Sequence, residues 1–464
     1  MNRINANLTV LLCLLSSFLT NATYGFSTRN HTSAAQPASD TIRSAPDELF
    51  RKGILANAPP VLSATGDQLY CPGTALFVVT DMTITDPDDT GTFAVYIQIS
   101  SGYQITEDLL ALTGSHPAIN ALWDAAAGKL TLTGSAATEV SYTDFIAAIK
   151  QVVYTNNDPN ANGSRTFSIS IGEANYLAST GHYYQFVPAL GITWSDARAV
   201  AETSTYYGLQ GYLATIAAAD EAQLSGEQAA GAGWIGGSDE AAEGVWKWVT
   251  GPENGTVFWN GGVAGSSPNF AFWNNGEPNN AENENYAHIT APGVGIPGSW
   301  NDLSNTGGTS GNYQPKGYIV EYGGMPGDPV LNISTSTTLT IPTIQSSSTA
   351  SICGPGTVTI SAVSDSGTVN WYAAPAGGTV LATGPSFTTP PLTATTTYYV
   401  AAAGASCPTA ARVPVAAVVF DVPVLTVAPP AASCTGVVTL QATTTIGQIS
   451  WYASATGTEL ALAS

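Results

Sequence analysis

Two stretches of this 464-residue sequence gather oxygen-bearing side chains at high density. The first, FWNNGEPNNAENENYAHI at 272–289, places carboxylates, amides, a proline and a glycine between two apolar flanks, and the second, GSWNDLS, begins at Gly298. Carboxylate and amide oxygens are the donors that a hard cation such as Ca²⁺ takes, about six to eight at a time. The same residue types also form ordinary solvated turns. The sequence around both stretches is therefore needed to distinguish a cation site from a turn-rich loop.

The charge balance favours cations over polyanions as partners. Acidic residues outnumber basic ones 33 to 12, and the formal net charge is −21. Because so few Lys and Arg are present to replace phosphate counterions, no nucleic-acid partner is expected. Scarce charged residues with abundant Gly, Thr, Ser and Ala are typical of an extracellular, β-rich protein.

The N-terminal residues 1–25 are predicted to be a secretory signal peptide. They combine Arg3, the apolar run LTVLLCLLSSFLT and small residues near the end. No other segment is long and apolar enough to span a bilayer, so no transmembrane segment is expected. The mature protein is expected to be secreted or held at the outer cell surface, with residues 26–57 as a polar linker.

Residues 58–172 show a strand-like pattern. Segments such as FAVYIQIS, KLTLTG and FIAAIKQVVYT (145–155) lie between Gly, Asn and Asp turns, which indicates an all-β sandwich. The segment resembles the cadherin-like modules of bacterial surface proteins, and ITDPDD, with Asp86 to Asp89, stands where such modules often place an acidic calcium linker. The alternative, that these aspartates form only a solvated turn, stays open.

Residues 173–326 mix helical and strand patterns and contain both oxygen-rich stretches. GHYYQFVP predicts a strand, and the spacing of Trp194, Ala197 and Ala201 predicts a helix. AADEAQLSGEQAA at 218–230 predicts a second helix, with acidic residues near its start. GWIGGSDE, GVWKWVTG and KGYIVEYGG are predicted strands. The long Gly-, Asn- and Pro-rich stretch between them indicates a functional loop.

The motifs of this segment resemble those of an α+β C-type lectin domain. They are the W..AR helix, the G.LATI turn, WIGG, EPN, WND and the closing GYIVEY, in that order. The resemblance implies that one Ca²⁺ is surrounded by Glu277, Asn279, Glu284, Asn301 and Asp302, and that the bond before Pro278 is cis. It also implies a carbohydrate site at Glu277, Asn279, Glu284 and Asn301, where two neighbouring sugar hydroxyls complete the coordination. EPN implies equatorial 3- and 4-hydroxyls, as in mannose, fucose or N-acetylglucosamine.

The segment departs from the family in its cysteines. Ala201 and Val320 stand where one disulfide would be, and Tyr286 and Asn305 stand where the other would be. Both partners of each pair are absent, so no thiol is left over. Packing, or the calcium itself, is expected to replace the stability of these bridges.

No enzymatic activity is expected. The segment contains only His182 and His288 as histidines, both expected to be structural, and no HExxH motif, phosphate loop or GxSxG elbow occurs. Glu277 and Glu284 could in principle form a glycosidase pair, but calcium ligation would keep both ionised. Trp273 could stack on a sugar, although core packing is the favoured interpretation.

The C-terminal stretch contains a repeat. ICGPGTVTISAVSDSGTVNWYA from Ile352 is echoed by SCTGVVTLQATTTIGQISWYA from Ser433. The copies resemble the Ig-like repeats of Bacteroidetes surface proteins, which also suggests type IX secretion. A linker is expected at 327–345, an Ig-like β-sandwich at 346–421 and a truncated second copy at 422–464.

Four cysteines lie outside the predicted signal peptide. Cys407 ends the first copy and is the expected disulfide partner of Cys353 in an exported chain. This pairing leaves Cys71 and Cys434 without a partner.

Together these features predict a multidomain surface adhesin that binds mannose-type glycans through Ca²⁺. Three alternatives stay open. The lectin-like domain could bind protein, it could bind calcium only for stability, or the chain could be a non-catalytic appendage of an enzyme beyond residue 464.

Overall fold

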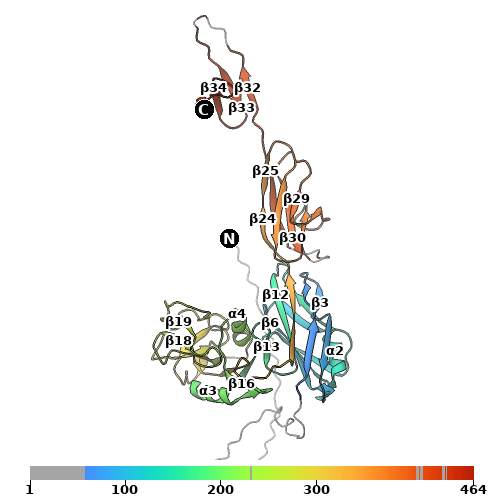
Figure 1. Cartoon of the computed structure of the whole chain (residues 1–464), viewed down its shortest axis with the longest axis vertical. Helices are drawn as coiled ribbons and strands as arrows, with labels where there is room; N and C mark the ends of the chain where they lie inside the picture. Colours follow the sequence, from blue (N-terminus) through green and yellow to red (C-terminus); the bar gives the residue numbers. More distant parts are fainter. Residues whose placement is uncertain are drawn as a thin grey trace, which may run out of the picture. The chain divides into compact units, whose positions relative to one another are not determined.

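The computed structural model describes residues 58–463, apart from 230–231, 404–406, 408–410, 431–433 and 435. The predicted signal peptide at 1–25 and linker at 26–57 lie outside the described residues. Strands dominate the described chain, and its helices are few and short (Figure 1).

The first part is a β-sandwich whose largest sheet has the strand order β2-β23-β12-β6-β9-β8. Alternation in β6 and β9 directs Val95, Ile97 and Leu132 into the core, where none of them is exposed. The strands of this part are β1 (Val61–Thr65), β2 (Gln68–Leu69), β3 (Ala75–Phe77), β4 (Asp81–Thr85), β5 (Gly91–Thr92), β6 (Ala94–Ser101), β7 (Asp108–Leu112), β8 (Ile119–Asp124), β9 (Lys129–Gly134), β10 (Val140–Ser141), β11 (Val152–Asn156), β12 (Gly163–Ser170) and β23 (Ser334–Ile341).

One predicted strand of this part is wrong in its first half. Residues 145–155 were expected to be extended, but helix α2 (Tyr142–Ile149) covers the first five of them and β11 begins at Val152. The Ser141 side chain caps the helix by accepting from the Asp144 N–H at 3.1 Å. Phe145, Ala148 and Ile149 then fall on one buried face.

The second part, residues 171–333, is an insertion between two neighbouring strands of the sandwich. Strand β23 pairs with β12 over eight residues, from Gly163↔Ile341 to Ser170↔Ser334. The expected linker at 327–345 therefore holds a sandwich strand instead, because the alternating buried residues Thr337, Leu339 and Ile341 of β23 complete the sheet. We call residues 171–333 the inserted module.

The inserted module is built on a mixed sheet flanked by short helices (Figure 1). The predicted strand at 181 and the predicted helix at 194 are confirmed as β14 and α3, and the second predicted helix is a short α-helix that continues as one π-helical turn. The elements are β13 (Asn175–Leu177), β14 (His182–Pro188), α3 (Trp194–Thr203), β15 (Thr205–Tyr206), β16 (Leu209–Leu213), α4 (Ala219–Ala222), η1 (Gln223–Glu227), β17 (Gly233–Ser238), β18 (Val245–Trp248), β19 (Val257–Asn260), β20 (Tyr286–Ile289), β21 (Trp300–Leu303), η2 (Gly311–Tyr313) and β22 (Gly317–Tyr322).

Packed side chains and a backbone hydrogen bond take the place of the disulfides that are typical of the family. Ala201 and Val320 are buried in one apolar cluster of the module. Tyr286 stacks on Trp194 with ring centroids 4.5 Å apart. The carbonyl of Asn305 accepts from the Trp194 N–H at 2.8 Å, which ties the segment after β21 to the start of α3.

Two glutamines of the module bond to the sandwich backbone. Gln228 is 3 % exposed, and its Nε2 donates to the carbonyls of Ile99 (3.0 Å) and Ala127 (2.7 Å). Gln223 accepts from the Gly102 N–H at 3.1 Å and donates to the Tyr103 carbonyl at 2.8 Å. Because a buried amide that lost such partners would be costly, these contacts fix the module to its host sandwich.

The third part is a two-sheet sandwich followed by two hairpins. One sheet has the order β24-β26-β29 and the other β25-β31-β30-β27-β28, with Trp371 fully buried between them. The hairpins pair β32 with β33 and β34 with β35. The strands are β24 (Ile344–Ser348), β25 (Ala350–Cys353), β26 (Thr359–Ser364), β27 (Thr368–Tyr372), β28 (Ala382–Thr383), β29 (Ser386–Thr388), β30 (Thr396–Ala403), β31 (Val413–Phe420), β32 (Leu425–Ala428), β33 (Gln441–Thr444), β34 (Ile449–Tyr452) and β35 (Glu459–Ala463).

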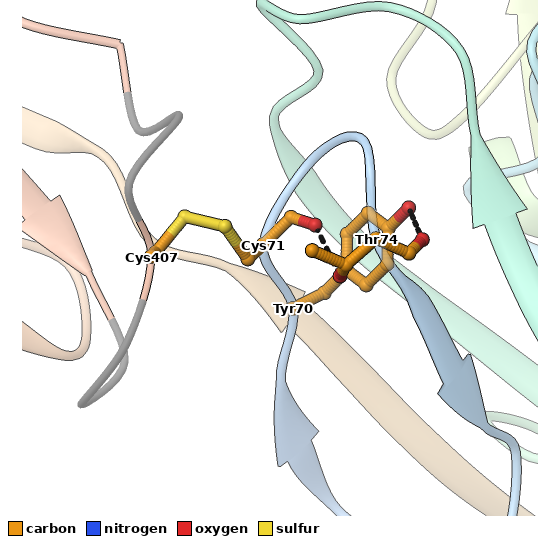
Figure 2. Close-up of a disulfide and its surroundings, with 4 residues drawn as sticks. All are labelled: Tyr70, Cys71, Thr74 and Cys407. Atoms are coloured by element: carbon orange, nitrogen blue, oxygen red, sulfur yellow. Dashed lines mark hydrogen bonds between the residues drawn. A yellow bond between two sulfur atoms is a disulfide. The ribbon is translucent and has the colours of Figure 1, made fainter. Parts of the chain in front are cut away.

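The predicted disulfide between Cys353 and Cys407 is wrong. Cys353 aligns with Phe420 at the end of β31, whereas Cys407 follows β30, whose end lies at the opposite end of the same sheet. The eight residues of β31 separate these ends by about 25 Å, because a strand rises roughly 3.3 Å per residue. Cys407 instead bonds to Cys71, with Cα atoms 5.3 Å apart (Figure 2). Cys353 is exposed and free, as is Cys434.

The turn that presents Cys71 is held by its neighbours. The Thr74 hydroxyl donates to the Cys71 carbonyl at 2.7 Å, and the Tyr70 hydroxyl donates to the Thr74 carbonyl at 2.8 Å (Figure 2). The bridge therefore links an ordered turn of the first sandwich to the segment after β30, and it joins two parts of the chain that lie 336 residues apart.

Candidate metal and ligand site

Aromatic residues anchor the long loop between β19 and β20. Trp273 forms a bridge with Trp300 of β21, and the Trp300 N–H donates to the Phe272 carbonyl at 2.8 Å. The Trp273 ring lies 4.8 Å from that of Trp246. Only 9 % of Trp273 is exposed, so the favoured interpretation is confirmed and this ring packs in the core.

The five candidate ligands line a single pocket of about 440 Å³. Glu277, Asn279 and Glu284 come from the loop, whereas Asn301 and Asp302 come from β21. The hairpin of β20 and β21 places the last two beside the loop, and the Glu277–Pro278 bond is cis, as the resemblance implied.

Asp302 organises the loop backbone. It is 1 % exposed, and its two carboxylate oxygens accept from the N–H groups of Asn279 at 3.0 Å and Asn280 at 2.7 Å. The Asn280 side chain in turn accepts from the Glu284 N–H at 2.8 Å. These bonds hold Asn280 at a positive φ of 50°, a conformation that asparagine tolerates better than most residues.

The carboxylates of the pocket repel one another. Partial burial, with the charge of Asp302 next, raises the pKa of Glu277 to about 7. Burial followed by the same charge raises the pKa of Glu284 to about 7. No Lys or Arg is among the residues that line the pocket. Three crowded carboxylates with two amides are a donor set that fits Ca²⁺, because a divalent cation would offset this repulsion.

Two carboxylates beside the loop, those of Asp239 and Glu243, were not predicted from the sequence. Asp239 follows β17 and is 2 % exposed, and its Oδ1 has no hydrogen-bond partner among the described residues. Burial raises its pKa to about 6. Glu243 accepts from the Asn280 side chain at 2.6 Å. The signal was present in GSDEAAEG, where two acids four residues apart follow a strand, but only the pairing of β17 with β20 shows that they adjoin the loop.

The two histidines of the module are not among the residues that line the pocket. His288 is fully buried with its ring edge against Trp234, and burial lowers its pKa to about 4. His182 Nδ1 lies 2.7 Å from a carboxylate oxygen of Glu321. Glu321 and Glu221 both accept from the Tyr184 hydroxyl, and burial, with the charge of Glu321 next, raises the pKa of Glu221 to about 7.

The acidic turn of the first sandwich brings Asp86, Asp88 and Asp89 together, with one carboxylate oxygen of each within 4.8 Å of the others. Asp86 Oδ1 accepts from the N–H groups of Asp88 and Asp89 at 3.2 and 3.1 Å. This bonding is typical of a turn closed by an aspartate. A calcium linker at this position stays a prediction.

Comparison with known proteins gives matches of different extent. Residues 340–420 match the family described as Ig-like domain, CHU_C associated. The chain is 31% identical over 315 residues to halomucin of Haloquadratum walsbyi; the match covers 65% of this chain but spans only 3% of that protein. The part of the chain that the structure describes contains no helix long and apolar enough to cross a membrane.

Solved structures give partial likenesses. One is the carbohydrate-recognition domain of the mouse scavenger receptor C-type lectin, at 22% identity and a TM-score of 0.22, covering 32% of this chain and 94% of that one. Another is a calcium-independent type II antifreeze protein, at 20% identity and a TM-score of 0.23, covering 33% and 94%. The family match over residues 340–420 identifies an Ig-like domain within a mostly β, multidomain chain.

Proposed function

We propose that the inserted module binds Ca²⁺ in the loop pocket and, through it, neutral sugars of the mannose type. The observation that carries the proposal is that all five candidate ligands, from two separate stretches of sequence, line one pocket: Glu277, Asn279, Glu284, Asn301 and Asp302. Three carboxylates and two amides suit a hard cation. The crowding that raises the pKa of Glu277 and Glu284 supports the same conclusion, since these groups gain most from a nearby positive charge.

Three residues of the pocket have distinct tasks in this proposal. The Asn279 side chain donates to Glu277 at 2.5 Å, so a donor and an acceptor already lie side by side. A sugar hydroxyl can take the place of this bond by accepting from the amide and donating to the carboxylate. Asp302 keeps the loop backbone in position. Calcium, when bound, supplies coordination to two neighbouring hydroxyls.

The chain is proposed to act as an adhesin that is secreted or held at the outer cell surface, reached through type IX secretion. The signal-peptide pattern at 1–25 supports export, as does an acidic composition in which charged residues are few. The disulfide between Cys71 and Cys407 supports it as well, because such bonds persist in oxidising compartments.

The test is binding of the full chain to a glycan panel, in parallel with calcium and with a chelator. We expect chelator-sensitive binding to mannose-type glycans, lost in Glu277→Gln, which keeps the size of the side chain but removes its charge. Glu139→Gln, at an exposed glutamate of the first sandwich, is the control and should bind like the wild type. Binding to galactose alone, or binding that the chelator leaves intact, would reject the proposal.

A second candidate uses calcium for stability only, in a structural or protein-binding adhesin. The repulsion among the pocket carboxylates favours it, because a cation would stabilise this loop whether or not a sugar follows. Calcium that raises the melting temperature of the module, with no glycan bound anywhere on the panel, would select this candidate.

A further inference from the structure

The pocket has a second wall that the proposed ligands do not occupy. After β21 the chain continues along the pocket, and Ser304, Gly307, Gly308 and Tyr313 line this side. Cation coordination through two neighbouring hydroxyls would hold only one edge of one sugar ring. Tyr313 lines the same pocket as the candidate ligands, so its ring is available to a second part of the ligand.

Tyr313 is unusually exposed for a tyrosine of this chain. Half of it, 51 %, is accessible, and among the tyrosines that the structure describes only Tyr452 is similarly exposed. Every other described tyrosine is buried or half-buried. An aromatic ring that stays at the surface and lines a polar pocket provides a flat apolar face for a ligand.

The loop fixes the position of Tyr313. The Gly307 N–H donates to the Ser304 carbonyl at 2.9 Å, and the Gly308 N–H donates to the Tyr313 carbonyl at 2.7 Å. A side chain on Gly308 would meet the Tyr313 backbone and Cβ at 3.1 to 3.2 Å, so this glycine permits the close approach. The Gly191 N–H also donates to the Pro315 carbonyl at 2.8 Å, which ties the end of the loop to the segment before α3.

The charge of the pocket disfavours anionic ligands. Glu277, Glu282, Glu284 and Asp302 line it, and no Lys or Arg does. One divalent cation would offset only part of four carboxylate charges. A sugar with a carboxylate, sulfate or phosphate would therefore be repelled along either wall.

We propose that Tyr313 is a specificity residue that stacks on the apolar face of a second sugar unit, so that the ligand is a neutral oligosaccharide of at least two units. The inference rests on the proposed function, since the first unit is the one bound through the cation. Tyr313 adds affinity for the neighbouring unit and leaves the coordinated unit unchanged.

The test compares methyl α-mannoside with α-linked mannobiose and mannotriose on the full chain, in excess calcium, by calorimetry. Tyr313→Ala is expected to lower affinity for the oligosaccharides about three- to tenfold, the range of an aromatic stacking contact, and to leave the monosaccharide unchanged. Tyr313→Phe should keep the wild-type affinity, because it keeps the ring. Tyr452→Ala is the matched control at the other exposed tyrosine.

The outcomes separate this inference from the function on which it rests. Calcium affinity, measured without sugar, should be the same in all variants and shows that the pocket is intact. If the wild type binds oligosaccharides and Tyr313→Ala binds them equally well, Tyr313 has no such role while the function stands. An equal loss for the monosaccharide would also overturn the inference, because the ring would then contact the first unit. A wild type that binds none of these sugars would overturn both.

Discussion

Replacing Asp302 with asparagine tests whether one carboxylate both orders the loop and serves the cation. Each Asp302 oxygen accepts from a different backbone N–H, that of Asn279 or that of Asn280. An asparagine has the same size but only one acceptor oxygen, so its amide group would face one of these N–H groups as a second donor.

The magnitude follows from the burial of Asp302, which is 1 % exposed. A buried donor that loses its acceptor costs about 1 to 3 kcal/mol. For a module of this size, each kcal/mol corresponds to roughly 2 to 4 °C of melting temperature. We therefore expect Asp302→Asn to melt roughly 2 to 12 °C below the wild type in chelator. The calcium-dependent gain, about 2.7 kcal/mol at a concentration of 100 times Kd, should also be lost.

The assay is thermal unfolding of the full chain with excess calcium and with chelator. Asp328→Asn is the matched control, because Asp328 also accepts from two backbone N–H groups, those of Gln210 and Met325, both at 2.9 Å. The control should lose stability but keep its response to calcium. An Asp302→Asn variant with the wild-type melting temperature in chelator and the wild-type calcium response would refute both roles of this residue.

Two further predictions concern pH and redox state. Burial raises the pKa of Glu221 from 4.5 to about 7, with the charge of Glu321 as the next cause, so the folded module binds more protons than the unfolded chain between these values. Stability should therefore fall as pH rises from about 4.5 to about 7 and level off above, and Glu221→Gln should flatten this dependence in melting curves recorded in excess calcium; a slope unchanged by the substitution would contradict it. For the disulfide, peptide mapping without reductant should recover Cys71 linked to Cys407 and should give the same result in Cys353→Ser; a Cys353–Cys407 peptide would contradict the structure.

The candidate site was largely predictable from sequence because its signals are local. EPN and WND are short motifs, and each identifies candidate ligands within three residues. The strands β20 and β21 that bring the two motifs together are adjacent along the chain. Asp239 and Glu243 were missed because they join the loop only through the pairing of β17 with β20, which bridges about 50 residues. Tyr313 carries no motif, and only the structure places it in the pocket.

The fold was predictable where periodicity is strong and failed where pairing is distant. The aromatic strand β14 and the helix α3 follow from their patterns. A short apolar run such as FIAAI is ambiguous between helix and strand, and the cap at Ser141 decides for the helix α2. The pairing of β23 with β12 and the disulfide partner of Cys71 join segments far apart in sequence, so no local pattern announces them.

The bond between Cys71 and Cys407 also determines how the chain carries mechanical load. A pulling force applied before Cys71 and after Cys407 would pass through the sulfur atoms. The segment between the two cysteines, which are 336 residues apart, would then carry no load. The inserted module sits within this closed loop, so tension on the ends would neither peel β23 from β12 nor stretch the ligand pocket. Once the bridge is reduced, the same tension would run through β23 and the module. A chain built in this way would keep the geometry of its inserted module under tension for as long as the Cys71–Cys407 bond stays oxidised.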